Sequence, residues 1–409
     1  MNDNLKKNFI WNTIGSLTNA MTSLVFLIIV TRINGIDEAG IFTFAFSTAC
    51  LLYIIGLYSG RTYQVTESNN KILDYDYIYS RIITSCSIIV LALLFSIIKQ
   101  YDVYKTFVIV LLAIFKSLES FIDVIYGIMQ KQSELYKSGI SMFLKALFGI
   151  IIFIIIDLLT KNIIYSVLSL IVVYLLIFIF YDLPNFKKYK INISSFDIEK
   201  IIYILKFGFF TFLVTFLTQY VINAPKYAID NHLTDNYQTI YGIISMPATV
   251  MALCSLFLIQ PFLNKLTELK IKNDYKGFNS LTIKLLMVLL IIGLILIFGT
   301  YILGIPFLQL LYNVNLSDQL FPLMIVIIGS VLYGLTSIIS NALIVLRKTF
   351  VQSIIFITVS VLSLIISELL VKMYGLIGAS FSYFIAMLVL LIMYSVFYLI
   401  IIKRCDNNE

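Results

Sequence analysis

The sequence predicts an all-α polytopic membrane protein in which about twelve transmembrane helices form two six-helix lobes around a central cavity. Composition, the spacing of long apolar runs and the distribution of basic residues carry this prediction. Of the 409 residues, 60% are hydrophobic and 12% are charged, and the mean hydropathy is +0.98. Soluble globular domains contain about 25% charged residues. A spanning helix needs roughly 20 mostly apolar residues, so about a dozen spans account for nearly the whole chain.

The apolar runs fall into two sets of six, separated by a polar and basic segment. Their predicted limits are residues 9–33, 41–59, 82–98, 104–129, 139–159 and 163–181, then 201–224, 240–263, 281–303, 320–346, 350–371 and 375–402. We therefore assign residues 1–181 to an N-terminal lobe, 182–200 to a cytoplasmic linker, 201–402 to a C-terminal lobe and 403–409 to a cytoplasmic tail. Pro247 and Pro261 bracket the eighth span and are expected to break its hydrogen-bond ladder.

The basic residues lie mostly in the loops of one side. With these spans, 19 of the 29 Lys and Arg residues fall on the side that holds both chain ends, and 6 fall on the other. Because cytoplasmic loops carry an excess of Lys and Arg, both termini are expected in the cytoplasm of a bacterial cell, with the spans in its cytoplasmic membrane. This topology also explains the net charge of +7, so no nucleic-acid partner is predicted.

No pattern of a soluble enzyme or a metal site is present in the sequence. The four Cys form no CxxC pair, and His232 is the sole His, so neither a metal site nor His-based catalysis is predicted. A nucleotide-binding loop and a Ser/His/Asp set are absent too. We therefore expect a protein that is not an enzyme and that binds no cofactor.

Charged residues cluster in the fourth predicted span. Lys116, Glu119 and Asp123 recur at three- or four-residue steps and share one helical face. A charge inside a bilayer costs several kcal/mol unless it is paired or hydrated, so these residues are candidates for coupling transport to an ion gradient. Lys145 of the fifth span is a further candidate, expected to pair with a carboxylate of the fourth. The alternative is a salt bridge that only locks two helices together.

Polar residues line one face of other spans. Asn12 and Asn19 lie on a single stripe of the first span, and Gln219 continues a threonine stripe on the seventh. We expect these faces to line a hydrated, substrate-binding cavity. Small and polar residues also serve helix packing in membranes, which is the alternative interpretation.

Basic residues mark the ends of three spans. Arg32 and Lys226 end the first helix of each half, and Arg61 ends the second helix. Cations at the mouths of a cavity favour an anionic substrate such as a diphosphate, and Arg binds phosphate oxygens in a bidentate manner. The competing interpretation is topology signalling by residues that reach the membrane interface.

Several segments resemble a known family. The stretch TRINGIDEAGIFTFAFS follows Asn12 in the first span and contains Arg32, Gly35 and Gly40. Together with RTYQVTE at 61–67 and DYDYIYSRIIT at 74–84, it is similar to the polysaccharide-transport branch of the multidrug, oligosaccharidyl-lipid and polysaccharide exporter superfamily, which includes O-antigen and capsule flippases. Many members have Arg where this chain has Lys226, so the charge is kept without the bidentate geometry.

The resemblance implies two six-helix lobes around a central cavity and alternating access. Its implied substrate is a polyprenyl-diphosphate-linked oligosaccharide repeat unit, moved to the outer leaflet for capsule, exopolysaccharide or O-antigen synthesis. A proton or sodium gradient would drive transport. Membrane lipids, a polysaccharide polymerase and glycosyltransferases are the implied partners, and the protein is expected to be a monomer.

Other functional classes fit the sequence less well. A cation-coupled antiporter of the related multidrug and toxin extrusion group usually carries an acidic residue in its first span, whereas residues 9–33 contain none. A major-facilitator transporter would have a Gly, Asp and Arg motif in the loop at 59–75, which is missing. A membrane glycosyltransferase or polymerase would need a large outer loop or a cytoplasmic catalytic domain with paired carboxylates.

Overall fold

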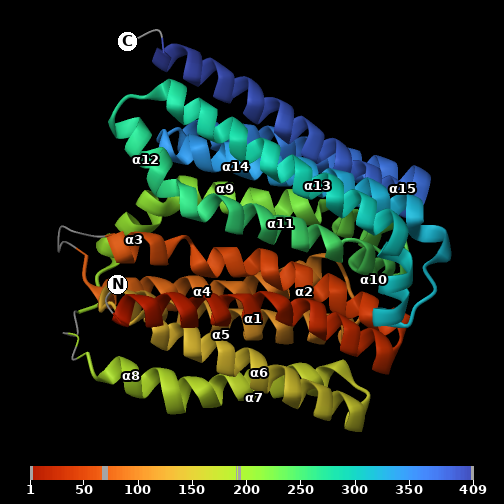
Figure 1. Cartoon of the computed structure of the whole chain (residues 1–409). Coiled ribbons are helices and arrows are strands. Elements are labelled where there is room, and N and C mark those ends of the chain that lie inside the picture. Colours follow the sequence, from red (N-terminus) through yellow and green to blue (C-terminus); the bar gives the residue numbers. More distant parts are fainter. Residues whose placement is uncertain (1–2, 67–71, 190, 192–194, 407–409) are drawn as a thin grey trace. The chain divides into compact units, whose positions relative to one another are not determined.

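The computed structural model describes residues 3–66, 72–189, 191 and 195–406, and all regular structure in these ranges is helical (Figure 1). Residue contacts divide the chain into unit 1, Met1–Phe216, and unit 2, Leu217–Glu409. Each unit is described separately below.

Unit 1 contains eight helices and the beginning of a ninth. In chain order they are α1 (Asp3–Asn34), α2 (Ile36–Leu57), α3 (Gly60–Thr66), α4 (Asp74–Ile98), α5 (Val103–Lys131), α6 (Leu135–Thr160), α7 (Ile163–Ile177), α8 (Leu183–Lys187) and α9 (Ile198–His232). A π-helical turn, Phe178–Asp182, joins α7 to α8.

Short turns with suitable residues separate the helices of unit 1. Gly35 lies between α1 and α2 at a φ of 94°, a left-handed conformation that glycine adopts without a steric penalty. Asp102 caps α5, because its side chain accepts a hydrogen bond from the Lys105 backbone N–H. Asn162 caps α7 in the same way through the backbone N–H of Ile164. Because these turns are short, the helices on either side of each turn run antiparallel.

Helices α1 and α6 pack with their backbones in close contact. A Cβ atom added to Gly139 would lie 2.3 Å from the carbonyl oxygen of Trp11, and one added to Gly15 would lie 2.2 Å from that of Gly139. Glycine at both positions therefore permits this approach, as small residues commonly do between membrane helices.

Unit 2 contains the rest of α9 and six further helices, α10 (Asp235–Ile244), α11 (Met246–Ile259), α12 (Leu263–Ile271), α13 (Tyr275–Tyr312), α14 (Leu320–Val345) and α15 (Thr349–Asp406). The predicted break of the eighth span is confirmed. Pro247 lies in the first turn of α11, and Pro261 lies in a 3-10 turn, Gln260–Phe262, between α11 and α12. Gly375, with φ 57° and ψ −131°, divides α15 into two helices.

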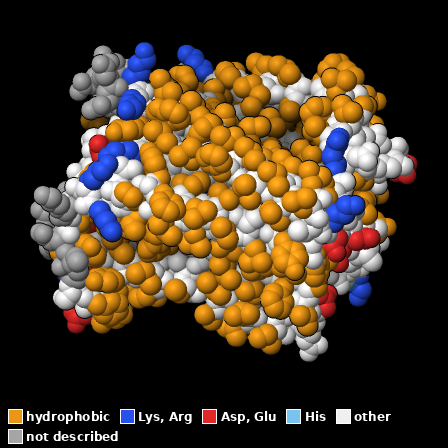
Figure 2. Space-filling model, turned by 90° about the horizontal axis from the view of Figure 1, so that it is seen from below, with side chains coloured by type: hydrophobic (Ala, Val, Ile, Leu, Met, Phe, Trp, Pro, Cys, Tyr) orange, Lys and Arg blue, Asp and Glu red, His pale blue; other side chains and the backbone are white. Residues whose placement is uncertain are grey.

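The helices account for the predicted spans. In the described part of the chain, ten helical segments are long and apolar enough to cross a membrane. One of them is α15, which holds two spans on either side of Gly375. Adding α5, which carries the charged fourth span, gives the predicted twelve. On the face shown in Figure 2, hydrophobic side chains cover the middle of the helices, and charged ones gather toward their ends. The chain is a multi-pass membrane protein.

Helix extends further into the predicted linker than the sequence indicated. Residues 183–187 form α8 directly after the π-helical turn, and α9 begins at Ile198. Residues 190 and 192–194 of the linker and 407–409 of the tail lie outside the described residues. The lobe limits, 1–181 and 201–402, stay a prediction, and the contact-based division falls within α9.

Candidate functional site

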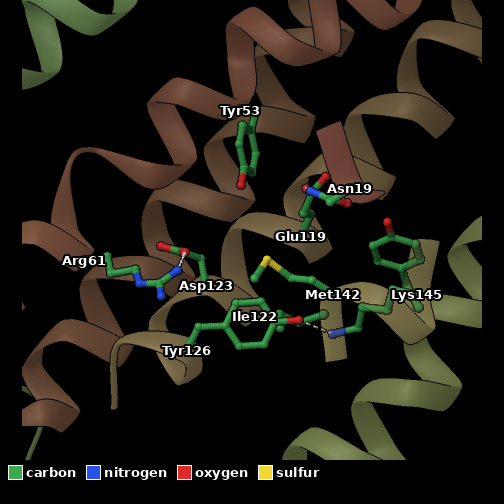
Figure 3. Close-up of a pocket in the computed structure, with 10 residues that line it drawn as sticks. Asn19, Tyr53, Arg61, Glu119, Ile122, Asp123, Tyr126, Met142 and Lys145 are labelled. Carbon is green, nitrogen blue, oxygen red and sulfur yellow. Dashed lines mark hydrogen bonds and ion pairs between the residues drawn. The ribbon is translucent and has the colours of Figure 1, made fainter. Parts of the chain in front are cut away.

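A small polar cavity lies inside unit 1, with a volume of about 60 Å³ (Figure 3). It lies among α1, α2, α3, α5, α6 and α7. Five of the residues singled out from the sequence line it, and the full set is Asn19, Tyr53, Arg61, Glu119, Ile122, Asp123, Tyr126, Met142, Lys145 and Tyr174. We call this space the unit 1 cavity.

Asp123 lies between two guanidinium groups. One carboxylate oxygen, Oδ1, lies 3.1 Å from Nη1 of Arg61, and the other, Oδ2, lies 3.3 Å from Nη2 of Arg81. Arg61 also donates from Nε to Oε1 of Gln130 at 3.1 Å. The Arg61 side chain is 26% exposed, but that of Arg81 is only 3% exposed. One cation is therefore fixed inside the unit, and the other reaches the rim of the cavity.

Sequence reasoning missed the role of Arg81. Counted there as a cytoplasmic loop residue, it lies within α4 and donates from Nη1 to the carbonyl oxygen of Gly56 at 2.8 Å, near the C-terminus of α2. A cation is favourable at that position, because the last carbonyls of a helix carry partial negative charge. The available signal was the helical spacing of Ser80, Thr84 and Ser85, which lie on the buried face of α4.

Glu119 pairs with Lys116, which lies on the same helical face. Nζ of Lys116 lies 2.7 Å from Oε2 of Glu119, three residues further along α5. Asn19 of α1 donates to Oε1 of the same carboxylate at 3.3 Å. The ammonium also lies 5.2 Å from the ring centres of Tyr53 and Phe115, where a cation is attracted by the ring faces.

The expected pairing of Lys145 with a fourth-span carboxylate is wrong. Its Nζ instead forms an ion pair with Asp182 and donates to the hydroxyl of Tyr126 at 2.9 Å. The side chains of Lys145 and Asp182 are 3% and 0% exposed. Asp182 had been assigned to the linker, but the π-helical turn carries it into the helical bundle. Sequence spacing alone could not reveal a partner 37 residues away.

The charges around the cavity do not balance. Among the residues that the structure describes, four basic side chains, Arg61, Arg81, Lys116 and Lys145, face three carboxylates, Glu119, Asp123 and Asp182. All three carboxylates are engaged by a cation, and one positive charge is left over. This surplus favours anions and disfavours organic cations. A volume of about 60 Å³ holds roughly two water molecules, so a larger anionic group could interact only at the rim, where Arg61 lies.

The other predicted residues are not among those that line this cavity. Arg32 is exposed in the last turn of α1, and the 22 residues of α2 between it and Arg61 correspond to roughly 33 Å. Asn12 lies where α1 packs against α6 near Gly139. Gln219 and Lys226 lie half-buried on α9 in unit 2. The predicted central cavity between two lobes stays a prediction.

A separate polar cluster lies between α5 and α6 and just after α8. The Oε2 atom of Glu134 accepts hydrogen bonds from Lys137 and from the hydroxyl of Tyr189, both at 2.5 Å. Burial opposes ionisation of Glu134, but these two hydrogen bonds outweigh it and lower the pKa of the carboxyl. Burial and the bond to Glu134 raise the pKa of Tyr189. The cluster ties the chain after α8 to the start of α6.

The fold matches that of known membrane transporters. No protein-family model matches the chain. An inward-facing multidrug resistance MATE family transporter of the MOP superfamily aligns with a TM-score of 0.76 over 98% of this chain and 99% of its own, at 13% identity. The lipid II flippase MurJ, in an inward closed conformation, aligns with a TM-score of 0.73 over 94% of this chain and 86% of its own, at 14% identity. The chain has the fold of MOP-superfamily transporters.

One relative is similar along nearly the whole sequence. The capsular polysaccharide biosynthesis protein CapF of Staphylococcus aureus is 27% identical over 407 residues, which cover 96% of this chain and 98% of CapF. This relative and the two structural neighbours confirm the resemblance to the superfamily that the sequence motifs indicated.

Proposed function

We propose that this protein is a flippase that moves a polyprenyl-diphosphate-linked oligosaccharide repeat unit across the bacterial cytoplasmic membrane by alternating access. The observation that carries the proposal is the surplus positive charge around the unit 1 cavity. A diphosphate is the anionic part of such a substrate. The similarity to CapF supports surface polysaccharide as the product that the substrate serves.

Arg61 is the proposed contact for the diphosphate. Its guanidinium is exposed enough to meet a phosphate group at the rim, and its planar fork matches two phosphate oxygens. Arg32, Lys226, Asn12 and Gln219 are proposed to contact the substrate elsewhere along its route.

Ion coupling is assigned to the charged groups of the cavity. Lys116, Glu119, Asp123 and Lys145 are proposed to link substrate movement to a proton or sodium gradient, because ionisable groups inside membrane helices commonly relay ions. Replacing Glu119 by Gln and Asp123 by Asn tests this role. Transport that keeps its rate and its pH dependence in both variants would leave these groups a purely structural role.

The proposal includes the cellular setting. We propose that both termini lie in the cytoplasm, where glycosyltransferases would supply the substrate, and that a polymerase on the outer side would consume the product. The protein is proposed to act as a monomer.

A deletion strain tests the function. Loss of the gene should abolish the surface glycan and leave lipid-linked repeat units on the cytoplasmic side of the membrane. Complementation with Arg61→Ala or Arg32→Ala should restore less glycan than complementation with Lys187→Ala or Lys188→Ala. Unchanged surface glycan in the deletion strain would refute the proposal. Equal effects of the four variants would remove the anion-binding role.

A cation-coupled multidrug antiporter is the second candidate, because a MATE transporter shares the fold with a TM-score of 0.76. The engagement of Glu119 and Asp123 by basic side chains argues against it, since neither carboxylate is left for a cationic drug. Drug susceptibility separates the two candidates. A deletion strain that keeps its glycan but becomes sensitive to organic cations would favour the antiporter.

A further inference from the structure

The short helix α3 follows an unusual turn at the end of α2. Tyr58 and Ser59 have φ values of 42° and 55°, a left-handed conformation that non-glycine residues rarely adopt. The turn persists because its neighbours hold it. Arg81 donates to the carbonyl of Gly56 at 2.8 Å, and the Tyr58 ring stacks on Phe212 of α9 with 4.3 Å between ring centres.

One face of α3 packs against α5. Besides the ion pair of Arg61 with Asp123, the fully buried side chain of Gln64 donates from Nε2 to the carbonyl of Val124 at 3.2 Å. Gly127 makes room for it, since a Cβ atom there would lie 2.2 Å from Oε1 of Gln64. α3 has only seven residues, and both contacts to α5 lie within it.

The other face of α3 contacts the beginning of α9. The hydroxyl of Tyr63 lies 2.8 Å from Oγ1 of Thr211, and its ring lies edge-on to Phe207 with 4.9 Å between centres. All of these residues belong to unit 1. Tyr63 follows Arg61 by two positions, so α3 carries the rim cation and the contact to α9 on the same turn.

Helix α9 is suited to respond to such a contact. In its most apolar stretch only 17% of the residues are buried, the smallest share among the ten spanning segments. Helices with few buried contacts open and shift most readily. α9 also continues past Phe216 into unit 2, where Asn231 and His232 hydrogen-bond to Glu368 of α15.

We propose that Tyr63 and Thr211 are positioning residues for translocation, which transmit the release of Arg61 from Asp123 to α9. An anionic group at the rim competes with Asp123 for Arg61, and Arg81 keeps the carboxylate compensated meanwhile. α3 then shifts, and the hydrogen bond between the two hydroxyls carries the shift to α9. This inference rests on the proposed function, because it requires an anionic substrate at Arg61.

The experiment compares substrate binding, the response of α9 and translocation. Full-length protein in nanodiscs is titrated with undecaprenyl diphosphate, and hydrogen–deuterium exchange is followed over residues 198–216. Translocation is measured as surface glycan in the deletion strain. The variants are Tyr63→Phe and Thr211→Val. Their matched controls are Tyr203→Phe, on the exposed side of α9, and Thr215→Val, whose exposed hydroxyl donates to the Thr211 carbonyl at 2.9 Å.

In the wild type, the lipid should change the exchange of α9. Tyr63→Phe and Thr211→Val should bind it with affinity within about twofold of the wild type, lose the exchange response and translocate about two- to tenfold more slowly, as expected for the loss of one hydrogen bond. The controls should behave as the wild type.

Three results would overturn the inference, and they are distinguishable. A wild type that does not bind the lipid removes the proposed function and this inference with it. Binding without a response of α9, or a normal response in both variants, removes the inference alone. A parallel loss of affinity and rate in the variants would place the two hydroxyls in the binding site, which also contradicts a positioning role.

Discussion

Replacing Lys145 by Met should destabilise unit 1 strongly. The substitution leaves the Asp182 carboxylate, which is 0% exposed, without its counter-charge. Among the described residues, Oδ1 of Asp182 already has no hydrogen-bond partner. Removing one partner of a buried ion pair costs about 3–5 kcal/mol, because the remaining charge is left uncompensated.

Thermal unfolding of the purified protein in detergent, followed by the monodisperse fraction after heating, measures this effect. For a unit of this size, about 2–4 °C accompany each kcal/mol, so the melting temperature should fall by roughly 6–20 °C. Asp182→Asn should lower the melting temperature as well, because it leaves the Lys145 ammonium without its counter-charge. The double variant Lys145→Met with Asp182→Leu should lie near the wild type.

Two results would refute this reasoning. A drop of less than about 3 °C would mean that the pair is hydrated rather than buried. A double variant as unstable as Lys145→Met alone would mean that lost packing, rather than an uncompensated charge, determines the effect.

Three further predictions concern other contacts. Arg81→Gln should lower the melting temperature more than Arg61→Gln, since only the Arg81 guanidinium is fully buried. Arg61→Gln should instead reduce surface glycan. A larger drop in melting temperature for Arg61→Gln than for Arg81→Gln would contradict the assigned roles. Gly139→Ala should cost about 1–3 kcal/mol by forcing α1 and α6 apart, whereas Gly299→Ala, with open space around it, should be nearly neutral in the same assay. Glu134→Gln should destabilise the protein at pH 7, and this destabilisation should disappear as the pH falls below the usual pKa of a glutamate, because a lowered pKa stabilises the fold only while the carboxylate is ionised. A difference in melting temperature between the variant and the wild type that stays undiminished in acid would count against the two hydrogen bonds.

Much of the site depended on contacts that local sequence cannot reveal. The helical period placed Lys116 and Glu119 on one face, and the structure pairs them at 2.7 Å. The same period could not show that Arg81 of α4 and Arg61 of α3 converge on Asp123. Nor did it indicate α3 itself, which depends on two left-handed residues whose neighbours hold them in place.

By itself, the sequence determined the membrane environment, the spans and the proline breaks. These follow from the hydrophobicity of consecutive residues and from the missing N–H of proline, both of which are local properties. The tertiary structure decided that Lys145 pairs with Asp182, that Arg32 and Arg61 lie at opposite ends of α2, and that the cavity of unit 1 has a surplus positive charge. These facts depend on which helix faces meet, and side-chain packing between distant segments, such as that at Gly15 and Gly139, sets those contacts.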